Sequence, residues 1–236
     1  DARSGFTVDL IGSVHVADAA YYDWLNRRFE IYDALLYELV APPGHTVPLG
    51  RDASSANPVG ALQNFIKGVL ELEHQLAHID YQKANFIHAD MSPDEFAQSM
   101  ADRDESVSRM IFQLLGRSLA QQHKLSAPDR APDVDLLAAL FAKDRALQLK
   151  MVLAEQFEDM ELLLTGFGGA DGSTLIEGRN AVALRVLGQQ IRQGRKKIGV
   201  FYGAGHLADM DQRVRRELGL KPIQTVWVTA WDLCAR

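Results

Sequence analysis

Two histidines stand at the same distance from a glycine near opposite ends of the chain, in Gly12-Ser13-Val14-His15 and in Gly203-Ala204-Gly205-His206. Each segment follows an apolar run that predicts a strand and comes before a predicted helix. Ligands of open parallel sheets bind beyond the carboxyl ends of the strands. If the two strands are neighbours, both imidazoles emerge at one edge, where Gly12 and Gly203 let the backbone turn sharply and admit another group.

A carboxylate is expected at the same edge. Glu38 interrupts an apolar run near the end of a second predicted strand, so its side chain should face solvent or the site. His15, Glu38 and His206 together are a sensible ligand set for a divalent metal ion. The same three groups could act without metal as general base, orienting carboxylate and acid. The residues alone leave both interpretations open.

Arg179 and Asn180 lie near the start of a helix predicted from Thr174 to Gln193, with Ser173 as its cap. Asn180 falls on the apolar stripe of this helix, so it either faces the site or makes a buried hydrogen bond. Arg179 either grips a substrate carboxylate or phosphate with two donors, or pairs with Glu177 or another surface acid.

Other polar residues are weaker candidates. His88 and Asp90 end a candidate strand within Tyr81–Ala89, and they would either enter the site or cap the next helix. His74 and His78 have the i,i+4 spacing of helical metal ligands, but an exposed polar face explains them better. The glycine-rich stretch Gly166–Gly172 follows a helix rather than a strand, which indicates a connector or lid.

The elements that must position these residues alternate between strand and helix at both ends of the chain. Strand, helix and strand within the first 40 residues form a βαβ unit, which implies parallel pairing. We therefore predict an α/β fold whose central, mostly parallel sheet is built from the N- and C-terminal segments. A helical insertion at about residues 59–165 interrupts a single domain over residues 1–236. The strands expected are Phe6–Ile11, Asp33–Val40, Lys197–Tyr202 and Gln224–Ala230. The helices expected are Asp18–Tyr32, Val59–Leu76, Pro93–Met100, Glu105–Gln122, Asp133–Leu164, Thr174–Gln193 and Asp209–Leu218.

Composition excludes several classes of protein. A net charge of −6 argues against a nucleic-acid groove. The one cysteine, Cys234, excludes an internal disulfide and a cysteine-rich metal site. No apolar run reaches the roughly 20 residues of a membrane span. A serine or cysteine nucleophile has no support, because Gly-x-Ser-x-Gly is absent and Cys234 has no site around it.

The segments Leu10–Val16, Leu36–Leu39, Arg179-Asn180 and Gly203–Leu207, in this order, resemble the TraB/PrgY–GumN–TIKI family. That family belongs to a wider group with erythromycin esterases and the haem-binding ChaN. The resemblance spans nearly the whole chain and implies one site made by two Gly-x-x-His motifs with a Glu and an Arg. Carried over by position, these are His15, Glu38, Arg179 and His206.

The resemblance implies hydrolysis of an amide or ester bond, with a peptide as the expected substrate and Mn or Co as the expected metal at His15, Glu38 and His206. Arg179 would stabilise the oxyanion or hold a substrate carboxylate, and Asn180 would orient the site. The alternative is a binding protein without turnover that carries haem or sequesters a peptide. The family often reads Glu-Arg-Asn, but Gly178 precedes Arg179 here, which leaves the role of Glu177 open. A chain that opens almost directly into a strand suggests a trimmed N-terminus, and we expect a secreted, periplasmic or envelope protein, with the cytoplasm as the alternative.

Overall fold

The computed structural model describes residues 5–47, 73–103, 144, 147–148, 150–151 and 173–234. Most of the predicted insertion lies outside these residues. So do the helix predicted at 105–122, nearly all of the helix predicted at 133–164, and the glycine-rich stretch at 166–172. The predictions for these segments, and the single domain over the whole chain, stay predictions.

A four-stranded sheet forms the centre of the described structure, in the order β1-β6-β3-β5. Its strands are β1 (Thr7–Ser13), β6 (Lys197–Gly203), β3 (Ala34–Tyr37) and β5 (Phe86–His88). All three pairings are parallel. The α/β prediction is therefore confirmed, and the first and last thirds of the chain meet where β6 lies between β1 and β3.

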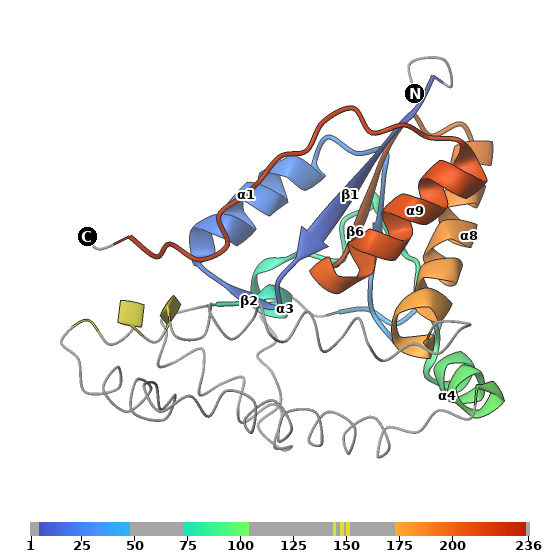
Figure 1. Ribbon diagram of the computed structural model, residues 1–236, viewed down its shortest axis with the longest axis horizontal. Helices are drawn as coiled ribbons and strands as arrows, with labels where there is room; N and C mark the ends of the chain where they lie inside the picture. The colour runs from blue at the N-terminus through green and yellow to red at the C-terminus, as the bar shows by residue number, and fades with distance from the viewer. Residues whose placement is uncertain are drawn as a thin grey trace, which may run out of the picture.

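Helices cover both faces of the sheet, as buried parallel strands require. Helix α1 (Ala19–Phe29) lies on one face, whereas α8 (Arg179–Arg192) and α9 (Leu207–Leu218) lie on the other (Figure 1). The α1 side of the core holds Tyr22, Leu25 and Phe29, which are at most 1% exposed. The other side holds Leu184 and Leu187 of α8 and Met210 and Val214 of α9. Removal of this apolar surface from water fixes the helices on the sheet and so fixes the strand ends.

The two helical segments that begin after a serine follow their sequence signatures closely. Helix α4 (Pro93–Asp102) begins with a complete capping box, in which the Ser92 hydroxyl accepts from the Glu95 N–H and the Glu95 carboxylate accepts from the Ser92 N–H. The Ser173 hydroxyl accepts from the Ile176 N–H, as predicted. Asp18 stands at the N-cap of α1 but makes no capping bond with its side chain. Its carboxylate instead accepts from Lys150, at 2.7 Å.

The middle of the chain corrects two details of the prediction. Of the helix predicted at Val59–Leu76, residues 59–72 lie outside the described part of the chain. Glu73–His74 forms strand β4, which pairs antiparallel with β2 (Val16–Ala17), and helix α3 spans Gln75–His78. His74 and His78 therefore do not share a helix, so the i,i+4 interpretation is wrong. The strand expected within Tyr81–Ala89 is present as β5, so the middle of the chain also contributes to the sheet.

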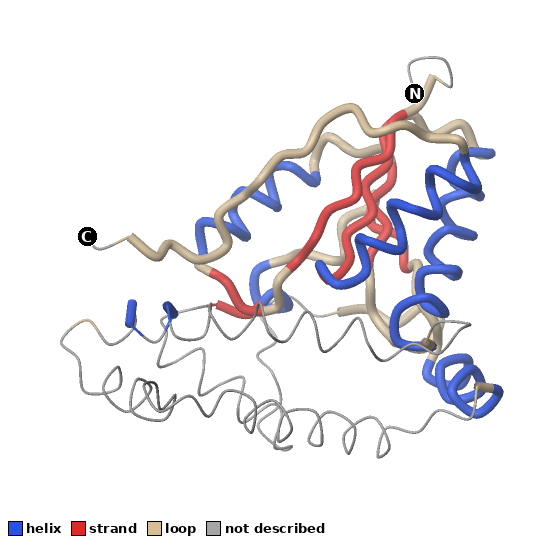
Figure 2. Tube along the Cα trace, in the orientation of Figure 1, coloured by secondary structure: helices blue, strands red, loops and turns tan. Residues whose placement is uncertain are grey.

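The predicted final strand is also wrong. Residues 224–230 run as an extended segment without strand pairing to the described part of the chain, and they pass along the α1 side of the molecule (Figure 2). Contacts at the end of the segment hold it, because the Ala230 carbonyl accepts from the Asp18 N–H and the Trp231 indole donates to the Val16 carbonyl. An alternating apolar pattern indicates that a segment suits a β-sheet, but it does not show that a partner strand lies beside the segment. Among the helices that the structure describes, none is long and apolar enough to cross a membrane.

Candidate active site

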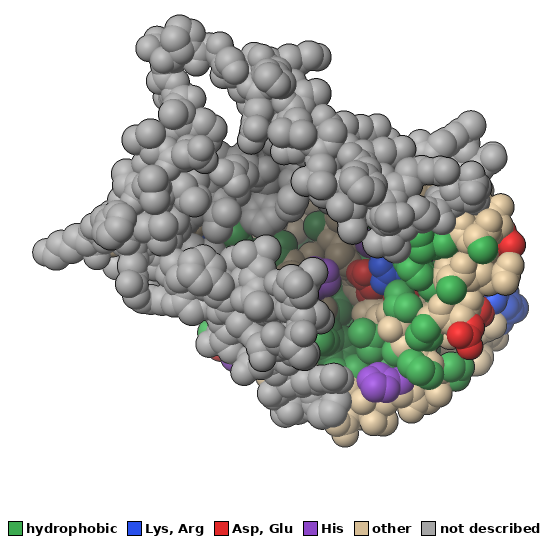
Figure 3. Space-filling view, turned by 90° about the horizontal axis from the view of Figure 1, so that it is seen from below, with side chains coloured by type: hydrophobic (Ala, Val, Ile, Leu, Met, Phe, Trp, Pro, Cys, Tyr) green, Lys and Arg blue, Asp and Glu red, His purple; other side chains and the backbone are tan. Residues whose placement is uncertain are grey.

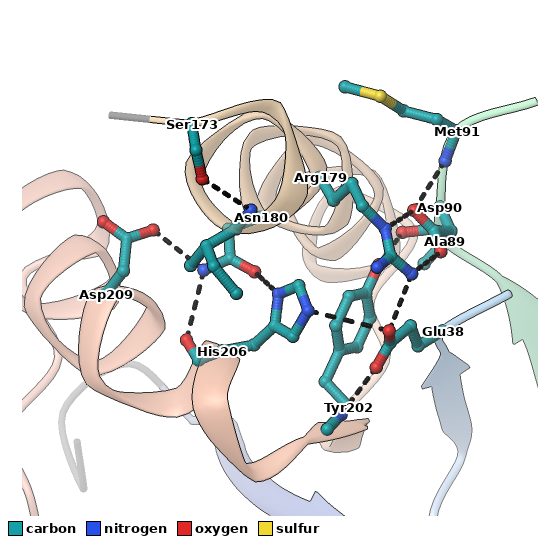
Figure 4. Close-up of polar contacts among 12 residues, drawn as sticks. Glu38, Ala89, Asp90, Met91, Ser173, Arg179, Asn180, Tyr202, His206 and Asp209 are labelled. Atoms are coloured by element: carbon teal, nitrogen blue, oxygen red, sulfur yellow. Dashed lines mark hydrogen bonds and ion pairs between the residues drawn. The ribbon is translucent and has the colours of Figure 1, made fainter. Parts of the chain in front are cut away.

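Charged side chains from four segments meet at the carboxyl edge of the sheet (Figure 4). Glu38 follows β3, Asp90 follows β5, Arg179 begins α8, and His206 ends the short 3-10 helix Ala204–His206 after β6. Figure 3 views the molecule from this edge and shows acidic, basic and histidine side chains close together on the described part of this face. Parallel strands deliver their ends to one place, so the convergence predicted for Glu38 and His206 is present.

Arg179 joins two carboxylates in the interior. Its Nε and Nη2 donate to the two oxygens of Asp90, at 3.0 and 2.5 Å, and Nη2 also donates to Glu38 Oε1 at 2.7 Å. All three side chains are buried or nearly so, with exposed fractions of 11% for Arg179, 0% for Asp90 and 15% for Glu38. Burial alone would lower the pKa of Arg179, but the bonds to Asp90 and the charge of Glu38 outweigh it and raise the pKa.

The sequence-based alternative that Arg179 pairs with Glu177 is wrong. The Glu177 carboxylate accepts from the backbone N–H of Ser173 at 2.6 Å and from the Ser173 hydroxyl at 3.1 Å. Glu177 therefore secures the start of the helix and takes no part in the charged cluster. Asp90, which the sequence assigned either to the site or to a helix cap, is the partner that Arg179 has.

Glu38 is held as an anion. Its second oxygen, Oε2, accepts from the Gly203 N–H at 2.6 Å, so both oxygens have donors. Burial would raise the pKa of Glu38, but the positive charge of Arg179 outweighs it, with contributions from His206 and the Gly203 N–H. The pKa is therefore lowered, and the carboxylate is ionised at neutral pH.

Asn180 sets which nitrogen of His206 carries the proton. The Asn180 amide nitrogen donates to Asp209 Oδ2 at 2.8 Å and to the His206 carbonyl at 3.1 Å. Both partners accept only, so the amide oxygen must be the atom that lies 2.7 Å from His206 Nδ1. An amide oxygen cannot donate, so Nδ1 carries the hydrogen in the neutral ring. Nε2 then presents a lone pair, 3.6 Å from Glu38 Oε1.

His206 is a neutral imidazole at neutral pH. Its side chain is 7% exposed, and burial lowers its pKa below the ordinary 6.5, although the charge of Glu38 opposes this. A neutral imidazole with a free Nε2 accepts a proton, whereas an imidazolium does not. The position of His206, the proton on Nδ1 and the neutral charge of the ring therefore all leave Nε2 able to accept a proton.

Two residues of the cluster were missed in the sequence. The sequence predicts Asp209 only as the start of a helix, yet its carboxylate accepts from both Asn180 and Arg213. The Tyr202 ring packs edge-on against His206 with centroids 5.2 Å apart, and its hydroxyl donates to the Ala89 carbonyl. Burial raises the pKa of Tyr202, so it stays a neutral donor. The available clue was position, because Tyr202 precedes Gly203 and Asp209 lies one turn after His206.

A π-helical turn, Thr174–Gly178, delivers Arg179 and Asn180 to the site. The Gly178 N–H bonds to the Ser173 carbonyl at 2.9 Å, which is the i→i+5 pattern of this turn. Consecutive helical residues point about 100° apart. Arg179 can therefore reach Asp90 and Glu38 while Asn180 reaches His206, so two adjacent residues serve the two halves of the cluster.

The two motif glycines allow close approach, as predicted, but the sharp turn predicted at both is wrong, because Gly12 and Gly203 lie within β1 and β6 and neither has a positive φ. A Cβ on Gly12 would lie 2.9 Å from Leu207 Cδ1 and 3.5 Å from Ala204, so the second motif packs directly on the first. A Cβ on Gly203 would lie 3.3 Å from Glu38 Oε2. Gly12 thus brings the motifs together, and Gly203 makes room for the carboxylate that its own N–H binds.

His15 lies outside the hydrogen-bonded cluster. Its side chain is exposed, and within the described residues it makes no hydrogen bond or ion pair. Its carbonyl accepts from the Gln75 N–H, and the hydroxyls of Tyr21 and Tyr22 hold the Gly12 and Val14 carbonyls. His15 is still near enough for its charge to contribute to the lowered pKa of Glu38.

His88 has a structural role. Its Nε2 lies 2.6 Å from the Leu39 carbonyl and its ring packs against Tyr37. It therefore fastens the chain beyond β3 and does not reach the charged cluster.

The donor set suits proton transfer better than metal binding. No three acidic, histidine or cysteine side chains of the described residues are grouped to hold a metal ion. The Glu38 oxygen nearest His206 already binds the Arg179 cation, which would repel a second positive charge. His206 and Glu38 could each offer one ligand, but His15 is not beside them. The metal prediction stays a prediction, and no step below depends on it.

No protein family, curated protein or solved structure shows a significant match to this chain.

Proposed function

We propose that this protein hydrolyses an amide or ester bond, with His206 as the general base. The observation that carries the proposal is the pairing of His206 Nε2 with Glu38 Oε1 at 3.6 Å, beside Arg179, at the carboxyl edge of the sheet. Asn180 fixes the ring so that Nε2 has the free lone pair. A peptide is the substrate that the resemblance favours.

The separation of the two atoms suits one water molecule. A water about 2.8 Å from both Nε2 and Oε1 would donate one hydrogen to each, which leaves its lone pairs free. During attack on a carbonyl carbon, one proton passes to Nε2 and a C–O bond forms. The ionised Glu38 stabilises the imidazolium that results, because the negative charge lies next to the new positive one.

Arg179 supplies the positive charge of the site. Two of its nitrogens are bound to carboxylates, and Nη1 makes no hydrogen bond to a described residue. Nη1 is therefore the donor available to the oxyanion or to a substrate carboxylate. When the tetrahedral intermediate collapses, the bond to the leaving amine or alcohol breaks. The imidazolium then returns its proton to that leaving group.

The test is a hydrolysis screen with a matched set of variants. Wild-type protein is assayed on p-nitrophenyl esters and on a quenched-fluorescence peptide library, each in EDTA and with added Mn²⁺ or Co²⁺. His206→Ala should abolish cleavage, and Glu38→Gln should reduce it by about 100-fold or more. His45→Ala is the control, because His45 is an exposed histidine outside the cluster, and folding is checked by circular dichroism.

Each outcome decides between the alternatives. Cleavage that persists in EDTA and requires His206 supports the metal-free mechanism. Cleavage that needs added metal, and is also lost in His15→Ala, would instead support a metal ion bound by His15, Glu38 and His206. A Soret band on haem addition, or peptide binding without turnover, would show the non-catalytic alternative instead.

A further inference from the structure

An extended segment between α9 and Trp231 exposes apolar side chains on the surface. Ile223, Val226 and Trp227 are 76%, 61% and 92% exposed. Residues 221–229 make no backbone hydrogen bond to any residue that the structure describes. Their C=O groups, and their N–H groups except at Pro222, therefore have no backbone partner among the described residues. The groups on one side are available as the edge of a β-ladder, and an apolar segment of this kind readily adds another strand.

The sequence of this segment identifies the strand that fits it. Residues 225–229 read Thr-Val-Trp-Val-Thr, which is the same in both directions about Trp227. Antiparallel pairing with an identical segment, centred on Trp227, would set Thr opposite Thr, Val opposite Val and Trp opposite Trp. Matched β-branched and aromatic cross-strand pairs are the stabilising ones in antiparallel sheets.

We propose that residues 225–229 pair with the same residues of a second copy of this chain, to form a two-stranded antiparallel ladder on a two-fold axis. Such an interface is isologous, since each copy presents the same surface. Side chains alternate along a strand, so Thr225, Trp227 and Thr229 share one face. The other face carries Val228, which already packs against the core cluster on the α1 side.

The segment is held at both ends in the extended form that pairing needs. At its start, Gly219 adopts the left-handed conformation that ends α9, and the Leu220 N–H bonds to the Val214 carbonyl. At its end, the Ala230 carbonyl and the Trp231 indole are bound near the start of α1. Because the extended form exists before association, little conformational entropy remains to be lost.

One strand pair is a small interface. Interfaces below the standard size give weak or transient complexes, so we expect a dimer that dissociates at roughly micromolar concentration. Sedimentation velocity from about 1 to 500 µM should show a monomer–dimer equilibrium. Trp227→Ala should raise the dimer dissociation constant about tenfold or more. The control Ile31→Ala removes an exposed apolar side chain outside residues 225–229 and should leave the constant unchanged.

Cysteine cross-linking tests the register independently of affinity. In a Cys234→Ser background, Thr225→Cys is mixed with Thr229→Cys and oxidised. Opposed residues of an antiparallel pair have Cα atoms about 4.5–5.5 Å apart, within disulfide range. Two copies of residue 225 would lie about 14 Å apart, four residues along the ladder, and cannot be bridged. The mixture should therefore form at least about ten times more disulfide dimer than either variant alone.

Three results would overturn the proposal. If sedimentation shows a monomer at every concentration, the chain does not form the proposed dimer. If Thr225→Cys alone forms as much disulfide dimer as the mixture, the proposed register centred on Trp227 is wrong. The third is slow amide hydrogen exchange over residues 225–229 that does not weaken on dilution. It would show that the segment pairs within its own chain, for example on β1. None of these results bears on the hydrolase proposal, because the segment and the charged cluster share no residue.

Discussion

The buried ion triad of Arg179, Glu38 and Asp90 makes a stability prediction that needs no substrate. Arg179→Met keeps most of the volume of the side chain and removes its charge. The variant then buries two carboxylates that have lost their cation, although Asp90 keeps the Met91 N–H and Glu38 keeps the Gly203 N–H. The loss should be large, because both acids are almost fully enclosed.

The magnitude follows from this burial. Removing one partner of a buried ion pair costs about 3–5 kcal/mol, since the remaining charge is left without compensation. For a chain of this size, that loss lowers the melting temperature by about 6–20 °C. Arg179→Lys keeps the charge but cannot bond two carboxylates through a planar fork, so its loss should be intermediate.

The loss should also depend on pH, with a definite sign. In the wild type the pKa of Glu38 is lowered, so its stabilisation is present above the ordinary 4.5 and disappears as the pH falls below it. In the variant, burial without Arg179 should raise the pKa of Glu38. The folded variant then binds more protons than the unfolded chain, and it loses stability as the pH rises. The difference between the two proteins is therefore largest near pH 7.5 and smallest near pH 4.

The assay is urea unfolding, followed by circular dichroism at pH 4.5, 6 and 7.5. The control is Arg216→Met, which removes an ion pair to Glu217 whose partners are 70% and 41% exposed. An exposed pair contributes about 0–1 kcal/mol, so this control should change little at any pH. If Arg179→Met loses under about 1 kcal/mol, or the same amount at all three pH values, the triad does not stabilise the fold as argued.

Three more predictions concern the neighbours of the triad. Gly12→Ala should lose up to about 1 kcal/mol in urea unfolding, because its Cβ would lie 2.9 Å from Leu207 Cδ1 and that side-chain end must shift, whereas Gly205→Ala meets no atom within 4 Å and should be neutral; equal effects would contradict the packing argument. Asp209→Leu should release the amide that orients His206, and ¹⁵N NMR should then show a mixture of ring tautomers where the wild type shows hydrogen on Nδ1; an unchanged spectrum would rule this out. Hydrolysis should rise with pH through an apparent pKa below 6.5 and then level off, because His206 must be neutral; a rise centred above 7 would assign the base elsewhere.

Local and periodic features of the structure could be predicted from the sequence. The apolar runs that became β1, β3 and β6 carry strand patterns, and Ser92 and Ser173 cap helices through chemistry that is visible in four residues. Parallel strands share an edge, so the meeting of Glu38 and His206 followed from topology alone. Asn180 was also detectable, since an amide on an apolar stripe must find a buried partner.

Partners distant in sequence were not predictable in this way. Arg179 had Glu177 two residues away and Asp90 89 residues away, and only the fold shows that it binds the distant one. The strand predicted at Gln224–Ala230 failed for the same reason. Propensity describes how residues suit a pleated surface, whereas a strand also needs a neighbour with free backbone groups. Sequence patterns therefore indicate which secondary structure a segment can adopt, but they do not show which other segment packs or pairs with it.

The two Gly-x-x-His segments show how far an equal spacing can be trusted. In the sheet, Gly12 lies opposite Tyr202 and Ser13 opposite Gly203, so the two motifs are one residue out of register. After Gly203 the chain turns at once into a 3-10 helix, which folds the ring of His206 back over the strand ends.

After Ser13 the chain takes a different path. It continues away from the sheet to form β2, whose partner β4 comes from residues 73–74. The backbone at His15 therefore depends on a segment outside its own motif, whereas the backbone at His206 is set within a few residues and its ring is held by Asn180. A side chain held in both ways suits the base of a reaction, since catalytic groups must be held within about 0.5 Å. That argument makes His206 the stronger catalytic candidate, although the spacing in the sequence treats the two histidines alike.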